Sequence, residues 1–202
     1  MKKANIVLVC LIVATCLAIG GYLLYEKAQH EKDLRNYPVA YTDLIAQYAA
    51  EFSLDPYLVT AIMRCESSND PAAVSKKGAI GLMQIMPDTG AWIAHKLDLD
   101  DSYQQQQLYD PAVNIRFACW YLRFLTNRLH QERTAIIAAY NAGHGSVEDW
   151  LSDPAYSENG RLNTIPFPET ERYLEKVTTA YDKYIVLYPE LYAGQTVAPG
   201  GA

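Results

Sequence analysis

The chain has 202 residues, of which half are hydrophobic and a fifth are charged. This composition is typical of a single globular domain with a short appendage, and it excludes an intrinsically disordered chain. The net charge of −6 argues against nucleic acid as a partner, because an acidic protein gains nothing from releasing counterions from phosphates.

The first predicted element is an apolar helix. Lys2 and Lys3 precede an uncharged stretch with an apolar run from Ile6 to Leu24. A helix of that length rises about 28 Å, roughly the thickness of the hydrocarbon core of a bilayer. Residues 1–25 are therefore predicted to be an uncleaved membrane anchor, and the polar residues 26–36 a helical stalk.

Two alternatives stay open for this segment. It could be a cleaved signal sequence, although no convincing small-x-small cleavage site is present around Gly20 and Gly21. Cys16 could carry a lipid, although Thr15 before it fits poorly and apolar sequence continues beyond it. For an anchor, the two lysines at the amino end predict a single-pass protein with a cytoplasmic amino terminus and its folded domain on the cell-wall side of the membrane.

The folded domain is predicted over residues 37–192, followed by a flexible tail over 193–202. Apolar residues in the domain recur at helical spacing almost throughout, and no convincing alternating strands are present, so the predicted fold class is all-α. The helix signals are an amphipathic stretch over 44–49, acidic caps followed by proline at Asp55-Pro56 and Asp110-Pro111, an alanine-rich stretch from Thr134 to Tyr140, and a last helix from Glu169 to Tyr188.

The first candidate site residue is Glu66, at the carboxyl end of the helix that starts at Asp55. The negative end of the helix dipole and apolar neighbours both favour the protonated carboxyl group. A carboxyl group that is protonated near neutral pH is what a general acid needs. From spacing alone, however, an ordinary surface acid at a helix end is the commoner explanation.

Three later motifs combine small residues with polar side chains, and each alone is typical of a packed turn or a helix cap. They are Gly81-Leu82-Met83-Gln84 after Ser75, Ala139-Tyr140-Asn141-Ala142-Gly143, and Pro166-Phe167-Pro168-Glu169-Thr170.

In this order, Glu66-Ser67 and the three later motifs resemble the lytic transglycosylases of the soluble lytic type, whose fold is that of goose-type lysozyme. The resemblance covers about Tyr41 to Tyr184. It implies an α-rich, lysozyme-like domain that cleaves the β-1,4 bond between N-acetylmuramic acid and N-acetylglucosamine and leaves a 1,6-anhydromuramyl end. It also implies that peptidoglycan glycan strands are the partner and that no cofactor is needed. A monomer is expected, and the sequence does not name any protein partner.

Carried over residue by residue, the resemblance implies that Glu66 is the catalytic acid and base. Ser75 matches a serine that faces this carboxyl group, and Glu169 matches a second acid that contacts the glycan. Cys65 departs from the pattern, since a polar residue such as glutamine commonly precedes the catalytic glutamate. The implied substrate-binding residues are Ser75, Met83, Gln84, Tyr140, Asn141 and Glu169.

Two other functions remain open. A lysozyme-like hydrolase on the same fold would need a second carboxylate to position water, and Asp70 is a candidate. A non-enzymatic peptidoglycan-binding module would be signalled by the loss of the carboxyl group at position 66, which is present.

The cysteines and histidines give weaker signals. Cys65 and Cys119 both lie on predicted helices outside the membrane, where a disulfide could form, but the sequence does not fix the distance between their Cα atoms. His144 is expected in a solvent-facing loop. The four histidines show no metal-ligand spacing: His30, His95, His130 and His144.

Overall fold

The structure is a computed structural model and describes residues 2–193. The chain divides into two compact units, Met1–Pro38 and Val39–Ala202. Apart from Ala193, the tail predicted over 193–202 lies outside the described residues.

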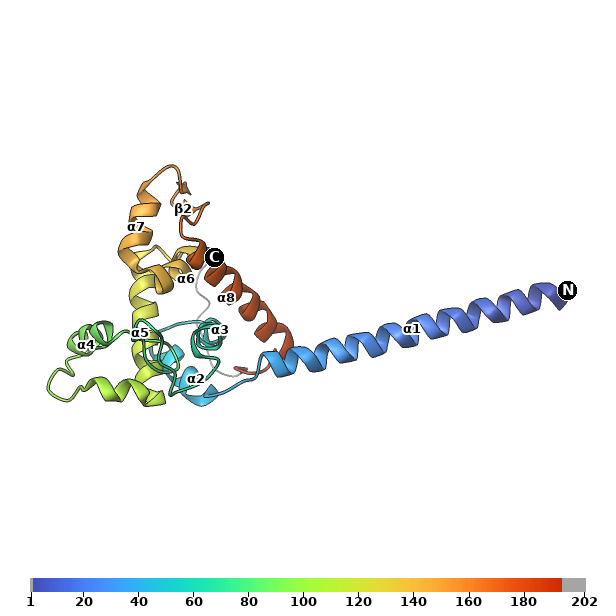
Figure 1. Cartoon of the computed structure of the whole chain (residues 1–202), viewed down its shortest axis with the longest axis horizontal. Helices are drawn as coiled ribbons and strands as arrows, with labels where there is room; N and C mark the ends of the chain where they lie inside the picture. Colours follow the sequence, from blue (N-terminus) through green and yellow to red (C-terminus); the bar gives the residue numbers. More distant parts are fainter. Residues whose placement is uncertain (1, 194–202) are drawn as a thin grey trace. The chain divides into compact units, whose positions relative to one another are not determined.

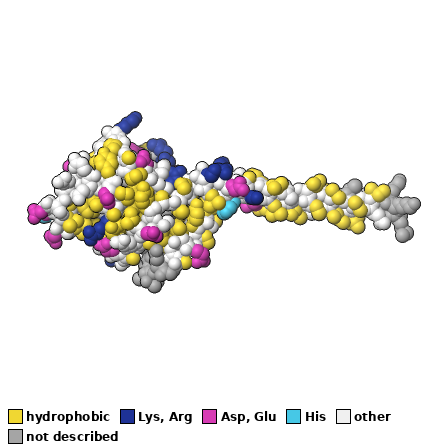
Figure 2. Space-filling model, turned by 90° about the horizontal axis from the view of Figure 1, so that it is seen from below, with side chains coloured by type: hydrophobic (Ala, Val, Ile, Leu, Met, Phe, Trp, Pro, Cys, Tyr) yellow, Lys and Arg dark blue, Asp and Glu magenta, His cyan; other side chains and the backbone are white. Residues whose placement is uncertain are grey.

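The first unit contains one continuous helix, α1 (Lys2–Asn36). Its apolar side chains are exposed, as Leu24 is at 71% (Figure 2). In the sequence of α1, charged residues follow the apolar run from Glu26 onward. Over Leu11–Asn36 this helix is long and apolar enough to cross a membrane, a property that signal sequences share. Residues 26–36, predicted to be a helical stalk, are helical and form the last 11 residues of α1.

The second unit is mostly helical, which confirms the predicted α-rich class (Figure 1). Its elements are α2 (Thr42–Glu51), α3 (Pro56–Ser67), α4 (Pro87–Lys96), the 3-10 helix η1 (Gln105–Tyr109), α5 (Pro111–Arg128), α6 (Arg133–Ala142), α7 (His144–Ser152), the short strands β1 (Ser157–Glu158) and β2 (Arg161–Leu162), and α8 (Pro168–Leu187).

Acidic side chains start three of these helices. Asp55 accepts a backbone N–H of the first turn of α3 over 2.9 Å, and Asp110 accepts two in the first turn of α5 over 2.8 and 3.0 Å. Both predicted starts are confirmed. The cap of α6 is Glu132, whose carboxylate accepts two backbone N–H groups, so this helix begins at Arg133 and not at Thr134.

The core is arranged around α5, which contacts α2, α4, α6 and η1. Two helices far apart in the sequence, α3 and α8, pack against each other, and α8 also contacts α6 (Figure 1). These contacts bring the carboxyl end of α3, the carboxyl end of α6 and the first turns of α8 to one place. The buried side chains of α5 form the centre of the core: Asn114, Ile115, Phe117, Ala118, Cys119, Leu122 and Leu125.

Three details differ from the sequence prediction or settle what it left open. A two-stranded antiparallel hairpin turns at Asn159-Gly160, both at positive φ, although no strand was expected. His144 is the first residue of α7 and not a loop residue; its ring packs edge-on to Phe124 with centroids 5.4 Å apart. Cys119 is buried and Cys65 is half-buried, and both are free thiols.

Candidate active site

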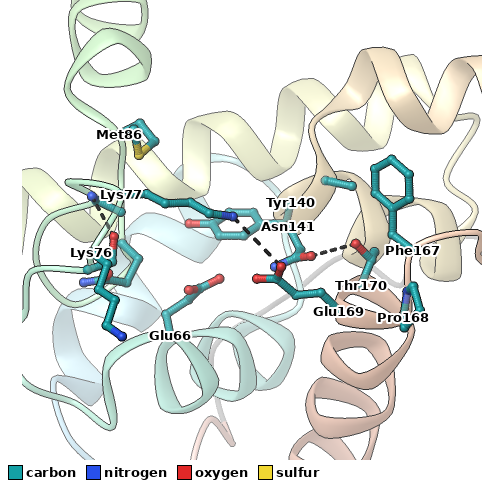
Figure 3. A pocket seen from close by; sticks show the side chains of 14 residues that line it. Glu66, Lys76, Lys77, Met86, Tyr140, Asn141, Phe167, Pro168, Glu169 and Thr170 are labelled. Atoms are coloured by element: carbon teal, nitrogen blue, oxygen red, sulfur yellow. Dashed lines mark hydrogen bonds and ion pairs between the residues drawn. The ribbon is translucent and has the colours of Figure 1, made fainter.

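A cleft of ≈ 720 Å³ opens where α3, α6 and α8 meet the loop between α3 and α4 (Figure 3). The structure brings six of the seven predicted site residues to its lining, and the seventh, Met83, lies behind it. The six predicted residues in the lining are Glu66, Ser75, Gln84, Tyr140, Asn141 and Glu169.

Glu66 is the residue before the last in α3, and its carboxyl group points into the cleft (Figure 3). Tyr173, a buried residue of α8, donates a hydrogen bond from Oη to Glu66 Oε1 over 2.6 Å. Burial raises the pKa of Glu66 to about 7, and the hydrogen bond from Tyr173 lowers it in part. The predicted rise is confirmed, and its cause is removal of water from around the carboxyl group.

The loop that carries several of the cleft residues is held from inside by Asn114, which is 1% exposed. Asn114 Oδ1 accepts the backbone N–H of Met83 over 2.8 Å. Its Nδ2 donates to the carbonyl groups of Ile80 and Leu108 over 3.0 and 2.7 Å. Gly81 fits beside this amide at φ +78, where a Cβ atom would meet the Leu108 carbonyl oxygen and lie 2.6 Å from Asn114 Nδ2. The glycine is therefore required by both conformation and space.

Met83 and Gln84 divide their roles on this loop. The Met83 side chain is fully buried, so it does not line the cleft as expected; instead its carbonyl group accepts a hydrogen bond from Tyr140 Oη over 2.9 Å. Gln84 adopts φ +50 and lines the cleft. Its Nε2 donates to the carbonyl groups of Ala73 and Gly81 over 3.2 and 2.9 Å, which leaves Oε1 to accept from a ligand.

Ser75 closes the turn below the cleft. Its Oγ accepts the backbone N–H of Ala79 over 2.9 Å, and its own N–H donates to the Ala79 carbonyl group over 2.9 Å. The hydroxyl proton remains available to donate into the cleft. Among the hydrogen bonds of the described residues, none joins Ser75 to Glu66.

The opposite wall joins the end of α6 to the start of α8. Thr170, which is 2% exposed, donates from Oγ1 to Asn141 Oδ1 over 2.8 Å. This bond fixes the amide plane of Asn141 beside Tyr140 (Figure 3). Thr170 and Tyr173 are site residues that sequence reasoning missed. The spacing of Tyr173 with Val177, at i and i+4 on α8, signals a buried face but not the carboxyl group that Tyr173 contacts.

Charged and aromatic side chains border the mouth of the cleft. Glu169 Oε2 lies 4.0 Å from Lys77 Nζ, and Lys76 is the neighbouring cation in the lining. Phe167 is 51% exposed and packs edge-on against Trp150, with ring centroids 5.0 Å apart. Asp70 is not in the lining; its side chain is exposed and accepts the backbone N–H of Ala72 in a local turn.

This arrangement offers one half-buried, protonatable carboxyl group in an open cleft with hydrogen-bonding walls, which suits acid–base chemistry on a polar ligand. Within residues 2–193, no group of three or more His, Cys, Asp or Glu residues is placed to hold a metal ion.

The chain matches the family described as the Transglycosylase SLT domain over residues 43–162. It is 36% identical over 154 residues to the soluble lytic murein transglycosylases of Salmonella typhimurium and Escherichia coli K12. It is 31% identical over 166 residues to the membrane-bound lytic murein transglycosylase C of Actinobacillus pleuropneumoniae. These matches cover 73%, 73% and 72% of this chain, but only 23%, 23% and 46% of the relatives. The chain thus spans less than a quarter of the length of the two soluble relatives.

Solved structures give the same result for the fold. The 70 kDa soluble lytic transglycosylase of Escherichia coli superposes with a TM-score of 0.70 at 32% identity, over 80% of this chain and 27% of that one. A complex of the 70 kDa soluble lytic transglycosylase with bulgecin A gives 0.71 at 31% identity, over 84% and 27%. An inactive glutamate-to-glutamine mutant of the lytic transglycosylase Slt from Pseudomonas aeruginosa gives 0.67 at 33% identity, over 80% and 26%. The resemblance drawn from four short motifs is confirmed.

Proposed function

The chain belongs to the Transglycosylase SLT domain family, and from this premise we propose that it is a lytic transglycosylase acting on the glycan strands of peptidoglycan. The observation that carries the proposal is the half-buried carboxyl group of Glu66, whose pKa is raised to about 7 by desolvation, in the lining of an open cleft. A pKa near 7 lets one group both give and take a proton at neutral pH.

In the first proposed step, protonated Glu66 donates its proton to the glycosidic oxygen between N-acetylmuramic acid and N-acetylglucosamine. The bond from the muramyl C1 to this oxygen breaks, and N-acetylglucosamine leaves with a 4-hydroxyl group. The positive charge that develops at C1 is shielded by the N-acetyl group of the same muramyl residue, as in substrate-assisted glycosidases. Tyr173 remains hydrogen-bonded to the carboxylate that Glu66 has become.

In the second step, ionised Glu66 accepts the proton of the muramyl 6-hydroxyl group. The 6-oxygen bonds to C1 and closes the 1,6-anhydro ring, so Glu66 ends protonated and no water is consumed. Attack from within one sugar residue has the high effective molarity that lets it outrun water. One carboxyl group therefore suffices, and no cofactor is needed.

The remaining cleft residues are proposed to position the strand. Gln84 Oε1 and the Ser75 hydroxyl group offer an acceptor and a donor on one wall. Asn141, oriented by Thr170, offers its amide on the other wall. Glu169 at the mouth would accept hydrogen bonds from sugar hydroxyl groups, and Met83 supports Tyr140 through its backbone.

We also propose that α1 is an uncleaved anchor, with the amino terminus in the cytoplasm and residues 39–192 on the cell-wall side. The apolar surface of α1 and the existence of a membrane-bound relative support this. Cell fractionation of the full chain, compared with a version in which charged residues interrupt 6–24, tests it. Release of a shortened soluble protein from membranes would favour a cleaved signal sequence.

The activity is tested by digesting purified peptidoglycan with the full chain in detergent and analysing the products by mass spectrometry. Anhydro-muropeptides are the expected products, whereas reducing muramyl ends would indicate a hydrolase that uses a second carboxylate, with Glu169 as the one other acid in the cleft lining. Glu66→Gln should abolish cleavage while keeping fold and strand binding. A Glu66→Gln protein that digests peptidoglycan at near the wild-type rate would contradict the proposal.

A further inference from the structure

The cleft carries positive charge that the proposed chemistry does not use. Lys76 and Lys77 both line it, opposite Glu169 (Figure 3). With Glu66 protonated, two lysines stand against one glutamate and leave a net charge of +1, in a chain whose total is −6. A local excess of positive charge in an acidic protein favours an anionic ligand at that place.

Lys77 extends across the cleft. Its side chain runs from the loop between α3 and α4 toward the first turn of α8, where Nζ lies 4.0 Å from Glu169 Oε2 (Figure 3). The Lys77 and Glu169 side chains are 81% and 71% exposed, so water screens the pair and the pair contributes little to stability. Lys76 is exposed, and no ion pair joins it to another of the described residues. Both ammonium groups can therefore turn to a better-placed anion.

On a muramyl residue that carries a stem, the sugars of the proposed substrate offer no such anion. Their hydroxyl and acetamido groups are neutral, and the lactyl carboxyl group is amide-linked to the stem. The negative charges of a glycan strand are the carboxylates of the peptide stem on each muramyl residue. In the proposed function Glu66 acts on the bond of a muramyl residue, so we expect the stem of that residue to lie near the cleft mouth, where Lys77 lies.

We propose that Lys77 exchanges Glu169 for a stem-peptide carboxylate when a strand enters, and so selects strands that carry charged stems. The proposal rests on the proposed function and names a specificity residue for it. Glu169, once released, becomes available to accept hydrogen bonds from sugar hydroxyl groups in the opened cleft.

The test compares two preparations of the same uncrosslinked glycan strands. One keeps its stem carboxylates, and the other is treated with carbodiimide and ammonium chloride, which convert carboxylates to neutral amides. The full chain in detergent is assayed for kcat/KM by release of anhydro ends. The wild type should prefer the charged strands about two- to fivefold, the size of one solvent-exposed ion pair, and added salt should reduce this preference.

The variants identify the residue responsible. Lys77→Met should bring the preference close to one, and Lys77→Arg should restore most of it. Lys96→Met removes the same charge from an exposed position on α4 outside the cleft and should behave as wild type. A wild-type preference near one, or a preference that survives Lys77→Met, would overturn the inference.

The failure of the inference and that of the proposed function differ in their readout. If the inference alone fails, anhydro ends form equally from both preparations. If no preparation yields anhydro ends, the proposed function fails, and binding decides the inference: Glu66→Gln protein is co-sedimented with each preparation, with and without Lys77→Met. Binding to charged strands that Lys77→Met removes supports the inference, and equal binding overturns it.

Discussion

Tyr173 Oη lies 2.6 Å from Glu66 Oε1, so a tyrosine of the last helix donates to the acid at the end of α3. Two opposing effects act on this acid. Burial disfavours the carboxylate and raises the pKa of Glu66 to about 7, whereas the hydrogen bond from Tyr173 favours the carboxylate and limits the rise. The contact between α3 and α8 therefore sets the pH range in which Glu66 can act as an acid.

Activity should fall as pH rises through about 7, because the first step uses protonated Glu66. Tyr173→Phe removes a bond that favours ionisation, so the pKa of Glu66 rises further. We expect the alkaline limb of the pH–rate profile to move up by about one pH unit and the maximal rate to drop about tenfold. Tyr181→Phe is the control, because Tyr181 also lies on α8 but donates its hydrogen bond to Asp55, the cap of α3. It should leave the alkaline limb unchanged. An unchanged or lowered limb in Tyr173→Phe would contradict the account.

Glu66 should also make stability depend on pH. Its pKa in the folded chain lies above the ordinary value, so its contribution to stability is complete below pH 4.5 and is lost as pH rises through about 7. The full loss is roughly 3 kcal/mol. Glu66→Gln keeps an acceptor for Tyr173 without the charge. Its Tm should equal that of the wild type near pH 4.5 and exceed it at pH 8 by roughly 6–12 °C.

Thermal unfolding followed by circular dichroism measures this difference. Glu169→Gln removes an exposed carboxyl group from the same cleft and serves as the matched control. If Glu66→Gln is less stable than the wild type at pH 8, the ionised Glu66 carboxylate does not destabilise the fold, which would contradict the prediction.

Asn114 should matter for both stability and activity. Asn114→Ala leaves the Met83 N–H and the carbonyl groups of Ile80 and Leu108 without their partner in the core. We expect a loss of about 3 kcal/mol in the free energy of unfolding, together with loss of activity, because the loop of Gln84 is released. Asn114→Asp keeps the acceptor but sets a carboxylate against two carbonyl oxygens, and should be no better. Asn127→Ala, exposed on the same helix, should be neutral.

Thr170→Val should separate positioning from stability. Valine keeps the shape but not the hydroxyl group that donates to Asn141. We expect a stability loss of about 1 kcal/mol and a KM raised roughly fivefold, with a smaller change in kcat, because Asn141 loses its fixed orientation. Thr179→Val, on the exposed face of α8, is the control. A KM equal to that of the wild type would remove Asn141 from strand binding.

Local signals were enough to predict most of the helices. Asp55 and Asp110 fix the starts of α3 and α5 through hydrogen bonds within one turn. Because both partners of each bond are close in the sequence, the local pattern is enough to predict these helix starts. The hairpin at Asn159-Gly160 was missed, although this dipeptide is the usual signal for a tight turn, because its strands are too short to show alternation.

The candidate site was predicted only as far as short motifs reach. Glu66 and Gln84 lie in such motifs, but Tyr173 and Asn114 act across 107 and 31 residues of sequence. Nothing local distinguishes Tyr173 from other tyrosines on a buried helix face. Met83 was predicted to line the cleft because it lies in a motif, but its side chain is buried in the core. Only its backbone carbonyl group contributes to the site, by accepting a hydrogen bond from Tyr140.

The unbroken course of α1 limits how far the proposed enzyme can reach. The stretch Glu26–Asn36 continues the apolar helix without a break and rises about 16 Å, whereas the same stretch fully extended would span about 36 Å. With α1 as the proposed anchor, the catalytic unit is attached through a short helical stalk. For this proposed anchor, we expect replacement of residues 26–36 by a flexible segment of equal length to increase the distance from the bilayer at which the enzyme can cut.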